Sequence, residues 1–328
     1  MNHSTFKSFT FGIGLFFTLP LVYGNSSSPS SSDGTLYINK SKTHKVAPVK
    51  YGFHYEEIGM MGEGALHAEL IRNRSFEEAT PPAGLSVKNG LYENVPAPRV
   101  KEKKVFQADP LIGWTTYPLS YTPVFISRTD ENPMSGENKY SMLVNVTEDI
   151  ANHPDALILN RGYYGMNLKT DTSYRLSLFL KNRNYSAPLR VFLVDEWGQR
   201  VSNVIEVNVG NRDWTKYTGE LKPEKNVRRG MFAIQPMSKG QFQIDVVSLF
   251  PSDTWNDGKS VFRKDIVQNL KEFSPSFIRF PGGCIVHGVN EETMYHWKKT
   301  LGPIENRPGQ WSKWAPYYRT DGIGYHEF

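Results

Sequence analysis

Charged side chains lie at the ends of two short apolar segments of the sequence. Glu56 and Glu57 come directly after an extended segment, and Arg279 lies in a second one that ends in the turn Pro281-Gly282-Gly283. Barrel enzymes place their active-site residues at such strand ends. A carboxylate and a guanidinium on neighbouring strand ends can form a charge-assisted pair, hold the hydroxyl groups of a sugar or set the charge of a catalytic carboxylate. The structural alternative is a buried ion pair that closes the mouth of a barrel.

Aromatic residues are a second group with a chemical use. They make up 13% of the 328 residues, a surplus typical of β-rich domains and of sugar-binding surfaces, because flat rings cover the apolar faces of sugars. Tyr163 and Tyr164 lie between two glycines, so we expect one of the two rings on the surface as a sugar platform. Further candidate platforms, for which a place in the core is the alternative, are Trp114, Trp197, Trp214 and Tyr217.

Composition argues against several other kinds of site. Cys284 is the one cysteine, which excludes an intrachain disulfide and a cysteine-built zinc site. His287, His296 and His326 lack the spacing of metal ligands, and we expect no metal or other cofactor. The formal net charge is +5, but no run of Lys or Arg is longer than two residues, so we expect no nucleic-acid partner.

The amino terminus has the pattern of an export signal. A lysine precedes an apolar run from Phe9 to Leu21, and a valine and a glycine follow where a signal peptidase reads small residues. The run is shorter than the roughly 20 residues that span a bilayer. We predict a signal peptide at residues 1–24, a serine-rich linker at 25–34 and a secreted or periplasmic mature protein without a membrane partner. The alternative is an uncut membrane anchor.

Residues 81–251 have the sequence of an all-β domain. Short runs rich in β-branched and aromatic residues recur between turn residues, and several of them alternate apolar and polar positions. We predict an antiparallel β-sandwich or jelly roll. The expected strands are Tyr140–Val146, Ala156–Leu159, Tyr174–Lys181, Arg190–Asp195, Val204–Val209, Met231–Gln235 and Gln241–Phe250.

Residues 35–80 and 252–328 flank this block and combine strands with helices. The expected elements are a strand within Lys45–Glu56, a helix over Ala65–Arg72, a helix over Val261–Phe273 capped by Ser260, a strand over Ser276–Phe280 and the start of a helix at Thr320-Asp321. This order predicts an all-β domain inserted into an α/β domain. A (β/α)8 TIM barrel takes about 250 residues, so the flanks supply only about two of its units and the chain is interpreted as a fragment.

Three motifs in a fixed order carry a family resemblance. They are Gly52–Gly59 with Gly64–Glu77, then Phe277–Gly288, then Trp297–Pro308 with Thr320–Phe328. Together they resemble the opening of the glycoside hydrolase family 51 α-L-arabinofuranosidases. The inserted region resembles the carbohydrate-binding, jelly-roll module of extracellular members. The resemblance implies a TIM barrel and an exo-acting, retaining enzyme that releases terminal arabinofuranosyl groups from arabinan or arabinoxylan.

The resemblance also implies roles for single residues. Glu56 matches the first-strand glutamate that binds the arabinofuranose ring, and Arg279 matches the arginine beside the nucleophile, where a positive charge favours the ionised carboxylate. Cys284 occupies a ring-binding position where some members carry Asn, although a thiol is the weaker hydrogen-bond partner. Trp297 and Trp314 fall in loops that line the family's pocket, with a core position as the alternative.

Both catalytic carboxylates of the family follow later barrel strands, which the resemblance places beyond Phe328. Glu327 matches a structural position. The expectation is therefore an amino-terminal portion of an arabinofuranosidase that is inactive alone. Two alternatives stay open. One is an exported, non-catalytic glycan-binding protein whose β-domain carries the function, and the other is a related retaining glycosidase that acts on a different sugar.

Overall fold

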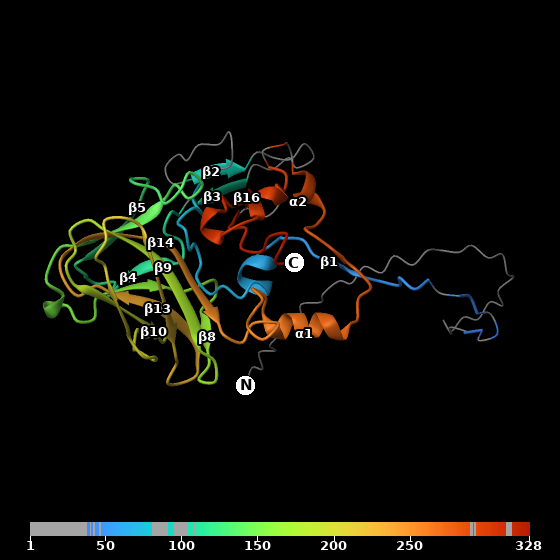
Figure 1. Cartoon of the computed structure of the whole chain (residues 1–328), viewed down its shortest axis with the longest axis horizontal. Helices are drawn as coiled ribbons and strands as arrows, with labels where there is room; N and C mark the ends of the chain where they lie inside the picture. The colour runs from blue at the N-terminus through green and yellow to red at the C-terminus, as the bar shows by residue number, and fades with distance from the viewer. Residues whose placement is uncertain are drawn as a thin grey trace, which may run out of the picture. The chain divides into compact units, whose positions relative to one another are not determined.

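The computed structural model describes residues 38–39, 41, 43–45, 47–80, 91–94, 104–107, 109–288, 291, 293–312 and 317–328. The chain divides into two units, Met1–Pro48 and Val49–Phe328. All helices and strands that the structure describes belong to the second unit (Figure 1).

Two antiparallel sheets make up most of the second unit. The first contains β4 (Trp114–Tyr117), β7 (Leu157–Asn160), β8 (Met166–Leu168), β10 (Pro188–Val194), β11 (Ile205–Asn208) and β13 (Val227–Gln235). The second contains β5 (Val124–Thr129), β6 (Ser141–Val146), β9 (Tyr174–Asn182), β12 (Thr215–Leu221) and β14 (Gly240–Pro251). The strand orders are β11-β10-β13-β7-β4, with β8 also paired to β13, and β12-β9-β14-β6-β5. All seven strands expected from the sequence form, with ends displaced by at most four residues.

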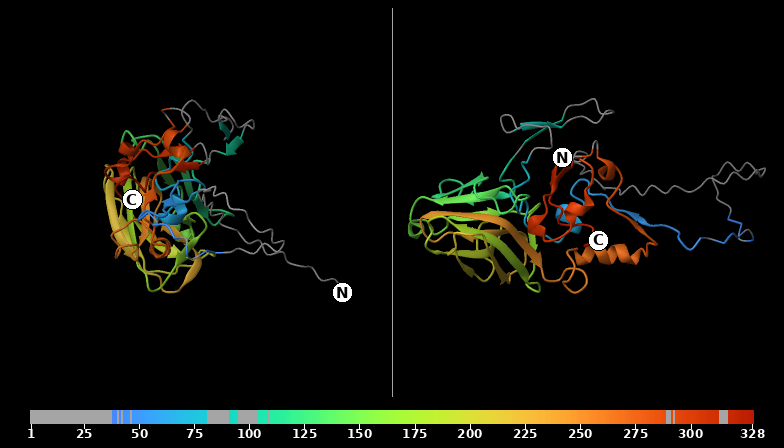
Figure 2. Two further views of the ribbon diagram at one scale, coloured as in Figure 1. Left: turned by 90° about the vertical axis from the view of Figure 1, so that its right-hand side faces the viewer. Right: turned by 45° about the horizontal axis from the view of Figure 1, so that its top comes forward.

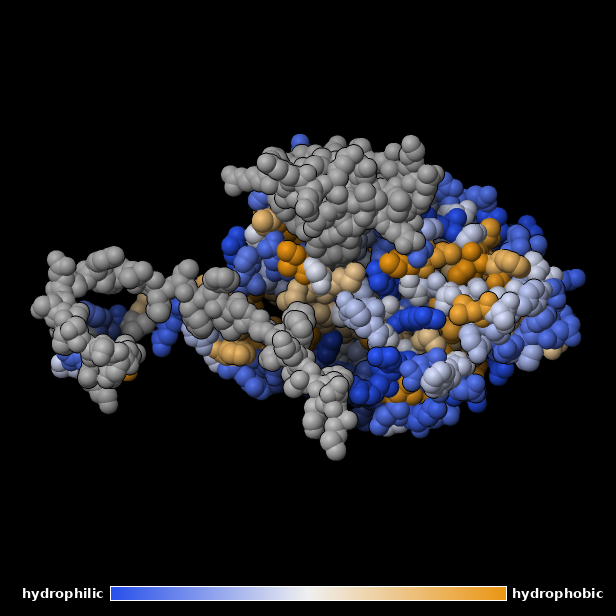
Figure 3. All heavy atoms as spheres, turned by 180° about the vertical axis from the view of Figure 1, so that it is seen from behind, coloured by the Kyte–Doolittle hydropathy of each residue, from blue (hydrophilic) through white to orange (hydrophobic). Residues whose placement is uncertain are grey.

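The two sheets pack against each other as a β-sandwich, which the layers of strands in Figure 2 show. Alternation along β9 buries Tyr174, Leu176, Leu178 and Leu180, while the residues between them face outward. These buried side chains share one core with residues of the first sheet, among them Ile158, Leu193, Phe232 and Ile234. Seen from behind, the surface shows hydrophobic patches separated by hydrophilic side chains, as on most proteins in water (Figure 3).

A short parallel strand pair belongs to the predicted α/β part. In β1 (Phe53–His54) and β15 (Ile278–Arg279), Phe53 lies opposite Ile278 and His54 opposite Arg279. Parallel strands need a long crossover connection, and here it contains the sandwich and α1 (Lys264–Glu272). The remaining TIM-barrel units stay a prediction. The other described elements are β2 (Leu91–Asn94), β3 (Lys104–Gln107), α2 (Cys284–His287), β16 (Gln310–Ser312), β17 (Tyr317–Arg319) and short helical turns at Gly62–Leu66, Ile150–Asn152, Trp297–Thr300 and Ile304–Asn306.

The prediction of a helix over Ala65–Arg72 is wrong. A π-helical turn ends at Leu66, and the following backbone bonds to the segment that leaves the sandwich. Ala68 N donates to the Val261 carbonyl (2.8 Å), and Leu70 N donates to the Leu249 carbonyl (3.1 Å). Hydrogen bonds to a distant part of the chain override the helical spacing of the apolar residues here.

Two helix starts also differ from expectation. Helix α1 begins at Lys264 rather than after Ser260, because Arg263 N donates to the Leu66 carbonyl (2.9 Å) and keeps this stretch beside residues 66–68. No helix begins at Thr320-Asp321. Asp321 has a φ of 54°, which is in the left-handed region and incompatible with a right-handed helix.

The buried carboxylate of Glu69 connects the segment that enters the sandwich to the strand that leaves it. Glu69 is 3% exposed and accepts hydrogen bonds from Ile71 N (3.0 Å), Leu249 N (2.8 Å) and the Ser248 hydroxyl (2.5 Å). Burial raises the pKa of Glu69 above its usual value, and the charge of Arg74 and these hydrogen bonds oppose the rise. One side chain thus joins the segment before the sandwich to its last strand.

Glu69→Ala should therefore lower the free energy of unfolding by about 3 kcal/mol or more, because it leaves buried donors without an acceptor. Urea unfolding of the full chain measures the change. Glu196→Ala, at an exposed turn, is the control and should cost no more than about 0.5 kcal/mol. Equal effects of the two substitutions would contradict the role of Glu69.

Candidate functional site

Glu56 lies just beyond β1, and the chain that follows β15 holds its carboxylate. Its Oε1 accepts a hydrogen bond from Ile285 N (3.1 Å). Its Oε2 lies 3.9 Å from Nε2 of His54 on β1. The carboxylate is therefore fixed at the end of the parallel pair, where the sequence predicted a site.

Arg279 faces the same turn as Glu56. A methyl group on Gly283 would lie 3.4 Å from Glu56 Oε2 and 3.8 Å from Arg279 Nη2. Both charged groups thus border the space above a residue without a side chain. Gly282 has a φ of 143°, and a methyl group there would lie 2.5 Å from Glu56 Cγ, so this position also requires glycine.

The buried ion pair considered as an alternative is not formed. Arg279 is exposed, and no ion pair joins it to Glu56 within the described parts of the chain. Glu57 is buried instead, and it accepts hydrogen bonds from the Tyr55 hydroxyl (2.8 Å) and from Glu63 N (3.4 Å). The consecutive glutamates have different surroundings: Glu56 borders the turn, and Glu57 joins a buried polar cluster.

Glu63 is the centre of that buried cluster. Its Oε1 accepts from the backbone N (3.0 Å) and the hydroxyl (2.6 Å) of Thr320, and its Oε2 accepts from the Tyr163 hydroxyl (3.1 Å). On either side of Thr320, Arg319 and Asp321 form a buried ion pair at 2.5 Å. A small cavity lies among Tyr55, Glu57, Glu63, Phe280, Pro281, Ile285, Tyr295, Arg319 and Ile323. Residues from separate segments of the chain therefore meet near the Gly282-Gly283 turn, which Glu56 borders. We call Glu56 and this turn together the Glu56 turn.

The other predicted site residues differ in their surroundings. Cys284 is exposed and begins α2, directly beside the Gly283 turn. Trp297 is 45% exposed, and its ring packs at 5.3 Å against the ring of Tyr325. Trp314 lies outside the described residues. The structure thus brings Glu56, Arg279 and Cys284 to one turn, whereas Trp297 packs against Tyr325.

One ring of the tyrosine pair is exposed, as the sequence predicted. Tyr164 is 79% exposed, whereas Tyr163 packs so closely on Gly64 that a methyl group there would lie 2.6 Å from the ring. Burial and the charge of Glu63 raise the pKa of Tyr163 well above its usual value. Tyr163 therefore packs against Gly64 and Glu63, and Tyr164 is the exposed ring of the pair. Of the other aromatic candidates, Trp114 is buried in the core and Trp197 is 71% exposed.

Glu327 has a structural environment. Its two carboxylate oxygens accept hydrogen bonds from Arg307 at 2.6 and 3.1 Å, and Gly324 N donates to it at 2.8 Å. Burial favours the neutral carboxyl group, but these hydrogen bonds and the charge of Arg307 lower its pKa below the usual value. The sequence did not single out Arg307, since an arginine in a loop carries no signal of burial.

The family model for the alpha-L-arabinofuranosidase 1 domain matches residues 269–328, which include Arg279 and the Gly282-Gly283 turn. Alpha-L-arabinofuranosidase 1 of Arabidopsis thaliana is 29% identical over 283 residues, 85% of this chain and 38% of the relative. The extracellular exo-alpha-L-arabinofuranosidase of Streptomyces chartreusis is 27% identical over 291 residues, 85% of this chain and 30% of the relative.

A solved structure agrees with these relatives. The arabinose-bound MgGH51 α-L-arabinofuranosidase superposes with a TM-score of 0.69 at 25% identity, over 88% of this chain and 43% of that one. The chain is a glycoside hydrolase family 51-like protein. This GH51-like chain spans less than half the length of the relatives it matches.

Glu78 provides a pH test of the packing beside the site. Burial raises its pKa from 4.5 to about 7, against the opposing charge of Arg72, whose Nη2 lies 3.2 Å away. The folded chain thus holds this proton more tightly than the unfolded chain does. The stability that comes from the neutral carboxyl group is complete below pH 4.5 and is lost as the pH rises to about 7.

We expect the difference in unfolding free energy between the natural chain and Glu78→Gln to fall over this range, by at most about 3 kcal/mol, because glutamine does not titrate. Urea unfolding at a series of pH values measures the difference, with Glu196→Gln as the exposed control. A constant difference would show that Glu78 keeps an ordinary pKa, and a difference that grows with pH would show a lowered one; either result would contradict the raised pKa.

Proposed function

We propose that the chain binds a terminal α-L-arabinofuranosyl group at the Gly282-Gly283 turn, as the amino-terminal part of an exo-acting, retaining α-L-arabinofuranosidase. The observation that carries the proposal is the Glu56 carboxylate, held by Ile285 N beside this turn with Arg279 facing it. A fixed carboxylate accepts hydrogen bonds from neighbouring sugar hydroxyls. An exposed guanidinium donates to oxygens and lowers the pKa of a nearby carboxyl group.

Cleavage with retention needs two carboxyl groups about 5–5.5 Å apart. Glu56 and Glu57 do not offer such a pair, since Glu57 is buried and bonded to Tyr55. The family resemblance assigns the acid/base and the nucleophile to glutamates beyond Phe328, and the relatives are more than twice as long as the part matched. The proposal is therefore that these 328 residues bind the sugar and do not cleave it.

The proposed substrate is an arabinose-containing polysaccharide such as arabinan or arabinoxylan, reached after export. The relatives are named arabinofuranosidases, and the Streptomyces protein is named extracellular. The proposed signal peptide, residues 1–24, lies outside the described residues. In the part of the chain that the structure describes, no helix has the length and apolar character needed to cross a membrane. No group of three or more His, Cys, Asp or Glu side chains that could hold a metal ion occurs in that part either.

Glu56→Gln should weaken binding of methyl α-L-arabinofuranoside to the chain by about tenfold, because a neutral amide replaces a charged acceptor of hydroxyl groups. Isothermal titration calorimetry or ligand-observed NMR measures the affinity. Glu224→Gln, at an exposed position of the sandwich, is the matched control and should leave it unchanged. Unchanged affinity in Glu56→Gln would remove this residue from the site.

The chain should release no nitrophenol from 4-nitrophenyl α-L-arabinofuranoside above the buffer rate, since the family resemblance assigns both catalytic carboxyl groups to positions beyond Phe328. Absorbance of the released phenol measures turnover. Turnover that Glu56→Gln abolishes would contradict the absence of cleavage while supporting the site itself.

A further inference from the structure

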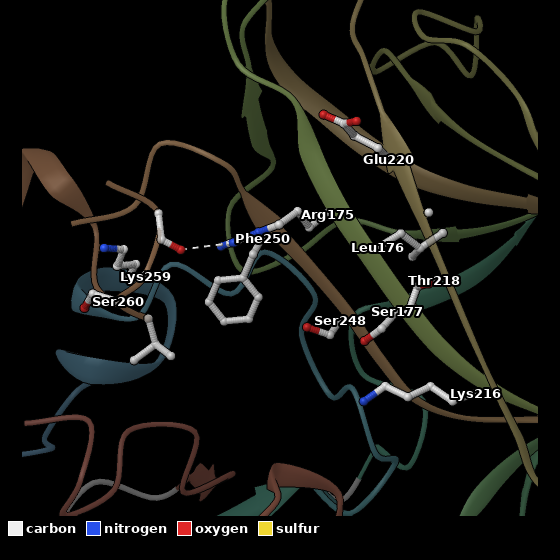
Figure 4. Close-up of a pocket in the computed structure, with 13 residues that line it drawn as sticks. Arg175, Leu176, Ser177, Lys216, Thr218, Glu220, Ser248, Phe250, Lys259 and Ser260 are labelled. Carbon is white, nitrogen blue, oxygen red and sulfur yellow. Dashed lines mark hydrogen bonds between the residues drawn. The ribbon is translucent and has the colours of Figure 1, made fainter. Parts of the chain in front are cut away.

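A groove crosses the outer face of the second sheet, on the side away from the sandwich core (Figure 4). Its volume is about 660 Å³, and its walls come from β9, β12, the end of β14 and the loop at residues 258–261. It continues into a second cavity of about 290 Å³ that shares Ser177, Lys216, Ser248, Phe250 and Val261 with it. Together the two cavities give room for several linked sugar units.

Three exposed cations line this groove. Arg175 comes from β9, Lys216 from β12 and Lys259 from the loop. Arg175 donates from Nη1 to the Gly258 carbonyl (3.0 Å), the dashed line in Figure 4, which leaves its other N–H groups for a ligand. Lys216 Nζ lies 3.6 Å from the Glu305 carboxylate.

Negative charge in the groove is small and already matched. Among the described residues of the first cavity, Glu220 is the one carboxylate, and its Oε2 lies 3.7 Å from Nζ of Lys222, which directly follows β12. Arg175 and Lys259 have no carboxylate within ion-pair distance in the described structure. In the second cavity, Glu305 lies beside Lys216 and Glu327 is paired with Arg307 at 2.6 Å. Arg175 and Lys259 therefore give the groove an excess of positive charge.

Hydroxyl groups and one aromatic ring lie between the cations. The hydroxyls belong to Ser177, Thr218, Ser248 and Ser260. The half-buried ring of Phe250 lies in the open centre of the view in Figure 4, and it packs against the buried ring of His67 at 5.3 Å between centroids. A fixed ring beside hydroxyls can contact both the apolar face and the hydroxyl groups of a sugar.

We propose that this groove binds a polysaccharide that carries carboxylate groups, that is, a chain containing uronic acid units. The hydroxyls and Phe250 fit the sugar rings, and the guanidinium of Arg175 fits a carboxylate in a bidentate fork. A neutral glycan would leave the excess charge of the groove unmatched. The groove shares no residue with the Glu56 turn, so this site is additional to the proposed arabinofuranosyl site and does not rest on it.

The test is calorimetric titration of the full chain with oligogalacturonate and with the same oligomer after reduction of its carboxyl groups. We expect binding of the acidic oligomer, little or no binding of the reduced one, and weaker binding as sodium chloride is raised. The double variant Arg175→Gln/Lys259→Gln should weaken binding by about fivefold or more, since two charge contacts are lost.

A matched double variant separates the groove from the general positive charge of the chain. Arg228→Gln/Lys239→Gln removes the same two charges from exposed positions outside the groove and should bind as the natural chain does. Glu56→Gln should also keep full affinity for oligogalacturonate, which distinguishes the two proposed sites. Circular dichroism checks that each variant is folded.

Three results would overturn the proposal: no binding of oligogalacturonate, equal affinity for the reduced oligomer, or an equal loss of affinity in the two double variants. The second would make the groove a neutral-glycan site, and the third would make the attraction one of net charge alone.

Discussion

Carboxylates buried between residues 57 and 78 hold the second unit together by binding backbone N–H groups of distant segments. Glu69 binds the last strand of the sandwich, Glu63 binds Thr320, and Glu77 accepts from the backbone N of Lys139 (2.7 Å) and Tyr140 (2.9 Å). Buried polar groups are costly unless paired, so each of these contacts fixes the position of two segments at the same time.

The Glu56 turn depends on that network directly. Glu57 follows Glu56 without a break and is anchored through Tyr55 and the backbone of Glu63, which in turn holds the carboxyl-terminal residues at Thr320. The strand end that carries Glu56 is therefore rigid on its buried side and open on the other. Precise placement of a sugar-binding carboxylate needs this kind of support from neighbouring residues.

Alternating apolar residues, as in Tyr174–Leu180, predicted the sandwich strands, and ordered motifs pointed to Glu56 and Arg279. The helix at Ala65–Arg72 failed because its apolar spacing is helical while its backbone bonds to Leu249 and Val261, which local spacing cannot reveal. Sequence reasoning missed the sandwich groove for a related reason. Arg175, Lys216 and Lys259 come from three separate segments, and only the packing of β9, β12 and the loop at residues 258–261 brings them together.

The parallel pairing of β1 with β15 also has a kinetic consequence. It joins Phe53 to Ile278 across more than 200 residues, and the entropy lost on closing a loop grows with loop length. Once the sandwich has folded, Leu70 and Leu249 are hydrogen bonded, and only short arms separate the two strands. The folded sandwich therefore lowers the entropy that is lost when β1 pairs with β15. We therefore expect the strand ends that carry Glu56 and Arg279 to assemble late in folding, and their backbone amides to exchange with solvent before those of the sandwich core.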